Sequence, residues 1–493
     1  MAAERALATF AGDCPPPPQG PNGHAATAVI NLPPATRAAG MRTGAQGDDM
    51  TPIRSSRRTA LAIALFASTL GMSASAQDAP KSSPVSAAFD AVRADPKVAK
   101  ALADLETDEA RTYGEQKQIA EIASPPFKET VRAEYFLKRL KEVGLADARI
   151  VPPEGYVIAT RKGDGGKPKL VVSAHLDSVF PEGTNVKVTE RDGVAYAPGI
   201  GDDARGLAVL LSMAGVLDKS GIETAGDVIF VGTVGEEELG NLRGVKALFR
   251  DRTDIDGFIS VDGIDVRRLV HRATGSHRYE ITFKGPGGHS FNAFGRPSAV
   301  HAMGRAIAKI ADVRTPSEPK TTFTVGTARG GTSVNAIAGE AIMTLDIRSN
   351  DEAELLKAEE QILGCVKQAV AEENQRWNAT ATTVEIKLIG DRPAGSTPED
   401  SPMVQAARRS IASVVAGAEI KLAGASTDSN VAMSLGVPAL TIGGGGEGGN
   451  EHALTEWYKP ANSHVGPQSV LLTVLTLVGV KGVSEPVLTV HRP

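Results

Sequence analysis

Short apolar runs alternate with helical segments along much of this chain, and this alternation restricts its fold more than any other feature. Each run has the length of a buried strand, and a helical pattern, RGLAVLLSMAGVL (205–217), lies between two of them. The runs are KLVVSAH (169–175), DVIFVG (227–232), FISVDG (258–263) and ALTIGG (439–444). Strands that alternate with helices form parallel sheets. The sequence therefore predicts an α/β fold with a mainly parallel sheet and helices on both faces.

A different pattern begins near residue 274. RYEITFKG (278–285) alternates between apolar and polar residues, as a half-exposed strand does, and amphipathic helices are predicted over 298–310 and 351–374. The order strand, helix, two strands, helix, strand is typical of a ferredoxin-like α+β domain. We therefore predict a small domain inserted into a larger one. The predicted boundaries are 77–273 and 390–493 for the larger domain and 274–389 for the insertion.

The first 76 residues have the composition of a leader. Residues 1–49 are rich in Ala, Gly and Pro, and we interpret them as an over-called start. From Met50, three arginines precede the apolar run TALAIALFASTLGM, and Ala74-Ser75-Ala76 is a small-residue cleavage site. A membrane anchor is the alternative, but the apolar run is short for a span. These features predict a signal peptide, for general or twin-arginine export, and a periplasmic or secreted mature chain.

Charge and cysteine content argue against several classes of protein. The 493-residue chain has 53 Lys and Arg against 58 Asp and Glu, a formal net charge of -5. A negative chain without runs of Lys or Arg is not typical of proteins that bind nucleic acid or anionic membranes. Cys14 and Cys365 are the only cysteines, too few for a disulfide framework or a cysteine-based metal site.

Acidic residues and histidines follow the predicted strands, at the edge where open α/β sheets place their sites. These residues are His175, Asp177, Asp202, Asp203, Glu236, Glu237, Glu238, Asp262 and His452. Histidines and carboxylates without a thiolate suit zinc, with manganese or cobalt as alternatives. The set exceeds the needs of one tetrahedral zinc, which favours two metal ions about 3.5–4 Å apart that share a carboxylate.

Each motif also has a purely structural interpretation. A lone histidine at a strand end is commonly a packing residue, and the pair Asp202-Asp203 can cap a helix. Three consecutive glutamates commonly form a solvated surface. The glycine run GGGGEGG (443–449) lacks the GK[ST] ending and the following helix of a phosphate-binding loop. The metal-site hypothesis depends on the shared position of these residues at one edge of the predicted sheet.

The combined motifs resemble those of the co-catalytic di-zinc peptidases and deacylases, which include glutamate carboxypeptidase, peptidase T, aminoacylase and succinyl-diaminopimelate desuccinylase. The matching segments are SAHLDSV, GIGDDARG, TVGEEE, SVDG, GPGGHS and NEHALTEW. The resemblance covers roughly residues 90–490. It implies that His175 and Asp262 bind one zinc and that Asp202 bridges to a second. The implied ligands of the second zinc are Glu237 and His452.

The same resemblance assigns the remaining acidic residues. It implies that Glu236 is the general base, that Asp177 orients His175, and that the peptide between Asp202 and Asp203 is cis. Three consecutive glutamates also allow a second register, in which the base and ligand roles move one residue on, to Glu237 and Glu238. The distance from the strand DVIFVG favours the first register.

By the same resemblance, the inserted domain is a lid that also joins two chains into a homodimer. It implies that His289, in GPGGHS, reaches the partner's active site and polarises the substrate carbonyl. The alternative for His289 is a structural turn histidine. Asn335 and Arg348 match lid positions near the substrate's carboxylate. The segment NAIAG stands where the family usually has Asn-Val-Ile-Pro, so the shape of that loop differs.

The implied chemistry is hydrolysis of an amide bond in a small peptide or an N-acyl amino acid. The sequence does not distinguish aminopeptidase, carboxypeptidase, dipeptidase and deacylase activities, because these depend on a few pocket residues. Two alternatives stay open. One is a non-catalytic binding protein on the same fold, against which the complete ligand set argues. The other is a di-zinc aminopeptidase without a lid, against which the insertion argues.

Overall fold

The computed structural model describes residues 83–491. The predicted leader, residues 1–76, lies outside the described residues. Within 83–491, none of the helices has both the length and the apolar character needed to cross a membrane.

A nine-stranded sheet forms the centre of the larger domain. Four neighbouring strands at its middle run parallel: β6 (Asp227–Thr233), β3 (Lys169–His175), β7 (Gly257–Val261) and β17 (Ala439–Ile442). Every residue of β6 and β7 is buried, as expected for strands covered on both faces. Parallel strands end at the same edge, so the loops that follow β3, β6, β7 and β17 meet there.

Shorter strands extend the sheet on either side. On one side β2 (Tyr156–Arg161) pairs antiparallel with β6, and β1 (Arg149–Val151) pairs with β2. On the other side β8 (Arg268–Ala273) pairs antiparallel with β17. The strands β15 (Gly395–Ser396) and β16 (Lys421–Ala425) both pair with β8. The fold class predicted from the sequence is confirmed.

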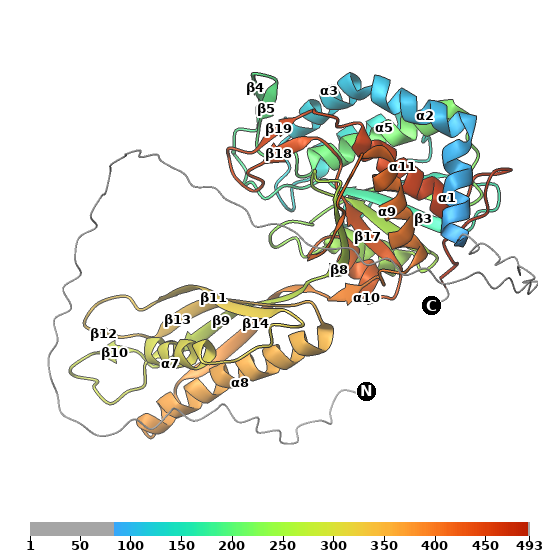
Figure 1. The fold of residues 1–493 in the computed structure, drawn as a ribbon. Helices are drawn as coiled ribbons and strands as arrows, with labels where there is room; N and C mark the ends of the chain where they lie inside the picture. The colour runs from blue at the N-terminus through green and yellow to red at the C-terminus, as the bar shows by residue number, and fades with distance from the viewer. Residues whose placement is uncertain (1–82, 492–493) are drawn as a thin grey trace, which may run out of the picture. The chain divides into compact units, whose positions relative to one another are not determined.

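Helices cover both faces of this sheet. The buried helices α5 (Ala204–Ser220) and α11 (Val465–Val478) contact each other and β3 (Figure 1). On the opposite face, Phe249 of α6 (Arg243–Asp251) packs against Phe258 of β7 with ring centroids 5.8 Å apart. Further helices are α1 (Pro84–Ala94), α2 (Pro96–Thr107), α3 (Glu109–Ala120), α4 (Thr130–Glu142), α9 (Pro402–Val414) and α10 (Ser429–Ser434).

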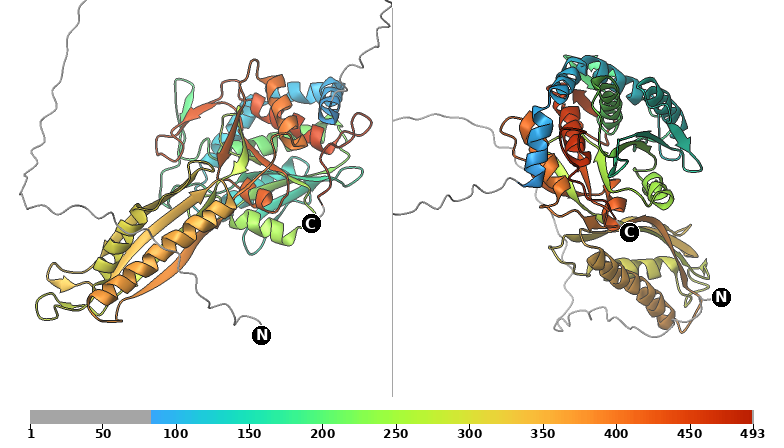
Figure 2. Two further views of the ribbon diagram at one scale, coloured as in Figure 1. Left: turned by 60° about the horizontal axis from the view of Figure 1, so that its bottom comes forward. Right: turned by 90° about the vertical axis from the view of Figure 1, so that its right-hand side faces the viewer.

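Residues 275–392 form a four-stranded antiparallel sheet and two helices, here called the lid (Figure 2). The strand order is β11 (Thr321–Gly330), β13 (Glu340–Ser349), β9 (Gly275–Lys284) and β14 (Thr383–Arg392). The helices α7 (Ala299–Ala311) and α8 (Glu352–Arg376) pack against the buried residues of one face, among them Ile281 and Phe283. The other face carries the residues that alternate with these buried ones along each strand, which are mostly polar.

The two regions have separate hydrophobic cores. One core is made of residues between 85 and 273 and between 403 and 488, and the other of residues between 279 and 369. The domain boundaries at 273/274 and 389/390 stay predictions. The second core lies between these two boundaries, and the first core lies outside them. A small pair, β10 (Gly288–His289) with β12 (Ala336–Ile337), forms the tip of the lid.

Candidate active site

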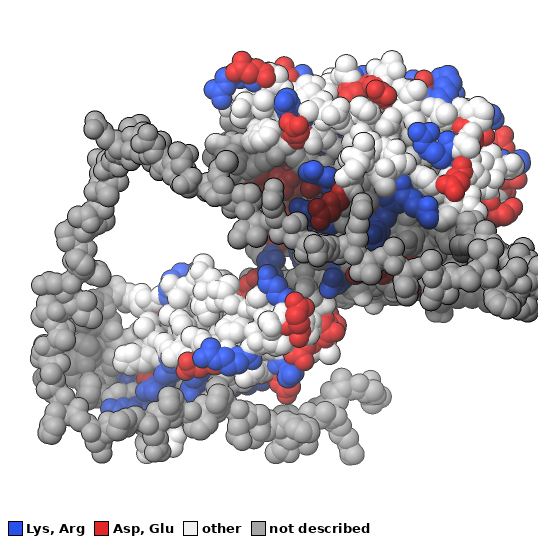
Figure 3. All heavy atoms as spheres, viewed as in Figure 1, with Lys and Arg blue, Asp and Glu red and all other residues white. Residues whose placement is uncertain are grey.

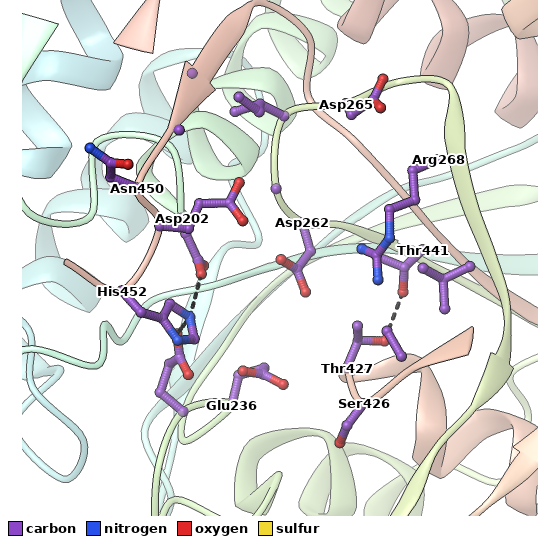
Figure 4. A pocket seen from close by; sticks show the side chains of 18 of the residues that line it. Asp202, Glu236, Asp262, Asp265, Arg268, Ser426, Thr427, Thr441, Asn450 and His452 are labelled. Atoms are coloured by element: carbon purple, nitrogen blue, oxygen red, sulfur yellow. Dashed lines mark hydrogen bonds and ion pairs between the residues drawn. The ribbon is translucent and has the colours of Figure 1, made fainter. Parts of the chain in front are cut away.

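A cleft of about 1090 Å³ lies at the carboxyl edge of the parallel strands. Its lining residues come from the loops after β6, β7 and β17, from β8, and from the strands of the lid. Asp202, Asp262, Glu236 and His452 point into the same space (Figure 4). The residues that sequence analysis placed at strand ends therefore meet in one place.

Asp202 lies at the centre of this cluster. Its Oδ1 is 2.8 Å from Nε2 of His175, and its Oδ2 is 2.9 Å from Nε2 of His452. The peptide between Asp202 and Asp203 is cis, as the family resemblance implied. The buried carboxylate of Glu456 accepts hydrogen bonds from the backbone N–H groups of Gly199, Gly201 and Asp202, at 2.7, 2.8 and 3.1 Å. Glu456 therefore holds the loop that presents Asp202.

Asp203, the neighbour of Asp202, has a structural position. Its side chain accepts a hydrogen bond from Gly206 N–H at 3.1 Å, which caps α5. It also accepts the backbone N–H of His175 at 2.9 Å. The helix-cap interpretation of this motif thus applies to Asp203, while Asp202 faces the cleft.

The loop after β6 separates its three glutamates. Glu237 Oε1 lies 3.2 Å from Nε2 of His452, whereas Oε1 of Glu236 accepts a hydrogen bond from Arg392 Nη1 at 3.2 Å. Glu238 has a positive φ of 49°, and its backbone carbonyl accepts a hydrogen bond from Arg278 at 2.7 Å. Glu237 is the glutamate beside His452, as in the first of the two registers.

Asp177 supports this loop in a way that the sequence did not predict. Its carboxylate accepts the backbone N–H groups of Glu236 and Glu237, at 3.1 and 2.8 Å. His175 Nδ1 contacts the backbone carbonyl of Asp177 at 3.1 Å, whereas the carboxylate is 3.9 Å away. His175 and Asp177 are in contact, but through the backbone carbonyl of Asp177, while its carboxylate accepts the glutamate N–H groups.

Three groups of side chains bring potential ligand atoms within 4.8 Å of one another. The groups are His175, Glu236 and Glu237; His175, Asp203 and Asp262; and Asp202, Glu237 and His452. All the atoms are imidazole nitrogens or carboxylate oxygens, which suit a borderline cation such as zinc. The two histidines meet on opposite oxygens of Asp202, so the donor set fits two cations that share this carboxylate.

The electrostatics of the cluster point to the same need for positive charge. Burial and the charge of Asp202 raise the pKa of Asp262 to about 7. Burial also raises the pKa values of Glu236 and Glu237. Hydrogen bonds to Asp202 and Glu237 raise the pKa of His452 to about 11. Buried carboxylates resist ionisation until a cation neutralises them, and a bound metal reverses this tendency.

The lid residues named from the sequence are divided between its two ends. Arg348 lines the cleft, with its Nε 2.7 Å from Asp346 Oδ2. His289 and Asn335 are exposed at the tip, where Phe291 N–H donates to His289 Nδ1 at 3.2 Å. Neither residue lines the cleft. A strand advances about 3.3 Å per residue, so the ten residues of β9 place the tip about 30 Å along the lid from its cleft end.

Sequence reasoning missed several residues that shape the site. Arg132 is fully buried and donates to the carbonyl of Leu176 at 2.9 Å. Asp428 is also buried: Thr233 donates to one carboxylate oxygen, and the other has no partner among the described residues. Burial raises the pKa of Asp428 to about 6. No periodic pattern marks these positions, although Glu456 lies within the segment NEHALTEW.

The parallel sheet and its cluster of histidines and carboxylates define an α/β protein with a site suited to metal ions. The chain belongs to peptidase family M20/M25/M40, whose model matches residues 171–476. The protein is therefore a peptidase or amidohydrolase, as predicted.

Solved structures share this fold. A tripeptidase from Staphylococcus aureus has a TM-score of 0.63 and 22% identity, over 74% of this chain and 97% of the tripeptidase. An aminopeptidase PepT from Bacillus cereus has a TM-score of 0.61 and 20% identity, over 75% of this chain and 98% of PepT. A dinuclear metal-binding peptidase from Bacillus subtilis has a TM-score of 0.57 and 17% identity, over 76% and 99%. At these identities the likeness shows the fold alone. Among curated proteins, no sequence matches this chain.

Proposed function

We propose that the protein is a two-metal exopeptidase or deacylase that hydrolyses amide bonds in small peptides or N-acyl amino acids. The observation that carries this proposal is the position of Asp202, whose two oxygens each contact a different histidine. The similar fold of a dinuclear metal-binding peptidase from Bacillus subtilis supports it. The lid, residues 275–392, argues against the alternative of an aminopeptidase that lacks such a domain.

The ligand set assigns residues to each cation. His175 and Asp262 would hold one ion and Glu237 and His452 the other, with Asp202 shared. Zinc is the preferred ion for this mixture of nitrogen and oxygen atoms, and manganese or cobalt are alternatives. When bound, the two ions supply Lewis-acid polarisation of the amide carbonyl and lower the pKa of a water molecule.

Glu236 is the proton carrier in this proposal. Arg392 donates to its Oε1, and Oε2 has no hydrogen bond among the described residues. Oε2 is therefore available to accept the proton of the attacking water and then to donate it to the leaving amine. The ion pair with Arg392 fixes the orientation of the carboxylate during both transfers.

Arg348 would bind a carboxylate of the substrate. Its Nε contacts Asp346, and within residues 83–491 its two Nη groups have no hydrogen-bond partner. A guanidinium with two free NH2 groups suits a carboxylate.

His289 requires a second copy of the chain. The tip that carries His289 and Asn335 is too far along the lid to reach the cleft of the same chain. The tip also exposes two aromatic side chains, Phe291 at 85% and Phe294 at 79%. An exposed apolar tip and the open edge of β11 are features that a homodimer would cover. We infer that the lid joins two chains and that His289 of one polarises the substrate carbonyl at the other.

Metal analysis of the purified chain, followed by a mass-spectrometric screen of mixed peptides and N-acyl amino acids, tests the function. The expected result is two bound metal ions per chain and release of amines that stops when the metal is removed. A folded protein that binds no metal and cleaves no member of the library would contradict it and favour a non-catalytic binding protein.

We also propose that the chain is exported, on the evidence of the residues from Met50 to Ala76. N-terminal sequencing of the protein from its native host should find a mature chain that begins near Gln77. Residues 1–49 on the exported protein would contradict this proposal.

A further inference from the structure

Arginines from both domains line the cleft alongside its acidic residues. Arg278, Arg348 and Arg392 line it from the lid, and Arg268 lines it from β8. On the face drawn in Figure 3, Lys and Arg are interspersed with Asp and Glu over the described residues. These arginines are therefore a local feature of the cleft and not part of a broad basic surface on that face.

The register of the lid strands explains why three of these arginines share one face. Arg348 and Arg392 both pair with Ser276 of β9, and Arg278 lies two residues further along the same strand. Residues that pair directly, or that are two apart in one strand, project from the same face. The opposite face carries Ile281 against the helices. Three guanidinium groups thus project from the polar face at the cleft end of the lid.

Only two carboxylates contact the four guanidinium groups. Asp346 accepts hydrogen bonds from both Arg278, at 3.3 Å, and Arg348, at 2.7 Å. Glu236 serves Arg392. Arg268 makes no side-chain hydrogen bond or ion pair with any residue in 83–491, whereas its neighbour Arg267 pairs with Asp265 at 3.0 Å. Of the five arginines that line the cleft, Arg268 is therefore the one whose guanidinium makes no ion pair within residues 83–491.

Arg268 faces the part of the cleft that lies beside the proposed metal site. Its side chain extends from β8 toward Thr441 and Thr427 (Figure 4), whose hydroxyl oxygens are 2.8 Å apart. β17 lies between β8 and β7, and Asp262 follows β7. Two strand spacings, about 10 Å, therefore separate the backbone at Arg268 from that at Asp262. This separation is about the length of one amino-acid residue with its side chain.

Ser426 links this wall to the lid. Its Oγ accepts a hydrogen bond from Arg392 Nη1 at 3.2 Å, and its own hydroxyl proton has no acceptor within the described chain. The positive charge of Arg268 acts on one acidic residue, Glu451. Burial raises the pKa of Glu451, and the charge of Arg268 lowers it. No hydrogen bond joins the two side chains in the described structure. Arg268 and the Ser426 hydroxyl thus offer hydrogen-bond donors that make no hydrogen bond to an anionic group within the described residues.

We propose that Arg268 binds a substrate carboxylate separate from the one that Arg348 binds, so that the enzyme prefers substrates with an acidic residue beside the scissile amide. The preferred class is then peptides of Asp or Glu, or N-acyl derivatives of these residues. This inference depends on the proposed hydrolytic function, which it makes more specific.

Matched pairs of substrates that differ only in Asp against Asn, or Glu against Gln, test the preference. The metal-loaded enzyme should have a kcat/KM about 10- to 100-fold higher for the acidic member, the range of one charge-assisted hydrogen bond. Arg268→Gln should remove most of this preference and leave the rates for the amide substrates within about threefold. Arg268→Lys should retain an intermediate preference. Arg272→Gln, on the same strand but outside the cleft lining, should change neither rate.

A binding measurement separates this inference from the proposed function. Calorimetry should show tighter binding of N-acetyl-aspartate than of N-acetyl-asparagine to a Glu236→Gln protein, and loss of the difference when Arg268→Gln is added. Equal affinity for the two compounds would overturn the inference even if hydrolysis is confirmed. An equal fall in both rates for Arg268→Gln, or the same loss of preference in Glu451→Gln, would show that Arg268 only balances Glu451. Tight acid-selective binding without hydrolysis would retain the inference and reject the proposed function.

Discussion

Charged residues have different surroundings in the cluster around Asp202 and in the lid. Around Asp202, carboxylates and histidines are buried together, and the pKa of Asp262 reaches about 7 because burial opposes its charge. In the lid, the core is apolar, and charged residues form ion pairs at its margin, such as Lys309 with Glu372 at 2.6 Å. The cluster is electrostatically incomplete without a cation, whereas the apolar core of the lid needs no ligand.

This difference separates positions that serve function from positions that serve folding. Burying unpaired charges opposes folding, so a protein retains them where a ligand will neutralise them. In the lid, residues with a proposed function are found only at the two ends of the sheet. Arg348 is at the cleft end and His289 is at the tip, about 30 Å apart by strand length. The sheet between them acts as a spacer.

The largest effect should follow removal of Glu236, the proposed proton carrier in the cluster. Glu236→Gln should lower kcat about 100- to 10,000-fold, the usual contribution of a general base, and keep both metal ions. Steady-state kinetics and metal analysis of the same sample measure the two results.

The two neighbouring glutamates provide the matched controls. Glu237→Ala should lose one metal ion, because Glu237 lies beside His452. Glu238→Gln should have little effect, because only the backbone carbonyl of Glu238 makes a described hydrogen bond. A metallated but inactive Glu237→Gln protein, combined with an active Glu236→Gln protein, would favour the second register.

The tip of the lid should give the next largest effect. His289→Ala should lower kcat about 100-fold, as expected for loss of one group that stabilises the oxyanion, and should not change metal content. Mixing His289→Ala chains with Glu236→Gln chains should restore part of the activity, because a heterodimer contains one site with both residues intact. A strict monomer with full activity in light scattering would reject both the dimer and the role of His289.

Metal removal should destabilise the cluster and leave the lid unchanged. Loss of the bound metal should lower the melting temperature by about 5–10 °C. Hydrogen exchange should increase in the segments 199–206 and 233–238, but not in β9 or β13. In the folded, metal-free protein the pKa of Asp262 is raised to about 7. Ionising Asp262 therefore costs the folded state no stability near pH 4, and this cost grows as the pH rises through about 7. The metal-free protein should therefore lose stability over this range. A metal-free protein whose stability is flat between pH 4 and 7 would contradict this account.

The smallest effect should come from an ion-pair network in the lid. His277 contacts Glu359 at 2.6 Å and Asp391 at 3.5 Å, and these interactions raise the pKa of His277 despite partial burial. A raised histidine pKa contributes stability below about pH 6.5 that is lost as the pH rises through the folded-state value. His277→Gln should therefore reduce the free energy of unfolding by less than about 1 kcal/mol at pH 6, with a smaller difference at pH 9. Urea unfolding at the two pH values measures this, and a larger loss at pH 9 would show that packing is responsible.

Much of this fold could be predicted from the sequence, because the signals are local. The apolar run 227–232 became β6, and the helical patterns at 298–310 and 351–374 became α7 and α8 with ends within two residues. A strand or helix pattern depends on neighbouring residues, and parallel strands place their ends at one edge. The grouping of His175, Asp202 and Asp262 follows from these two facts.

The exact partners within the site depended on the tertiary structure. Only in the folded chain does Glu237 lie beside His452. Only there does Asp203 cap a helix, and only there does the carboxylate of Asp177 accept two backbone N–H groups. Hydrogen bonds act over about 3 Å, whereas a sequence pattern places a residue only on an element and a face. For the same reason Arg392 and Glu456 were not predicted, since each reaches the site from a distant part of the chain. The sequence by itself determined which residue types gather at the edge of the sheet, and the tertiary structure determined which atoms meet there.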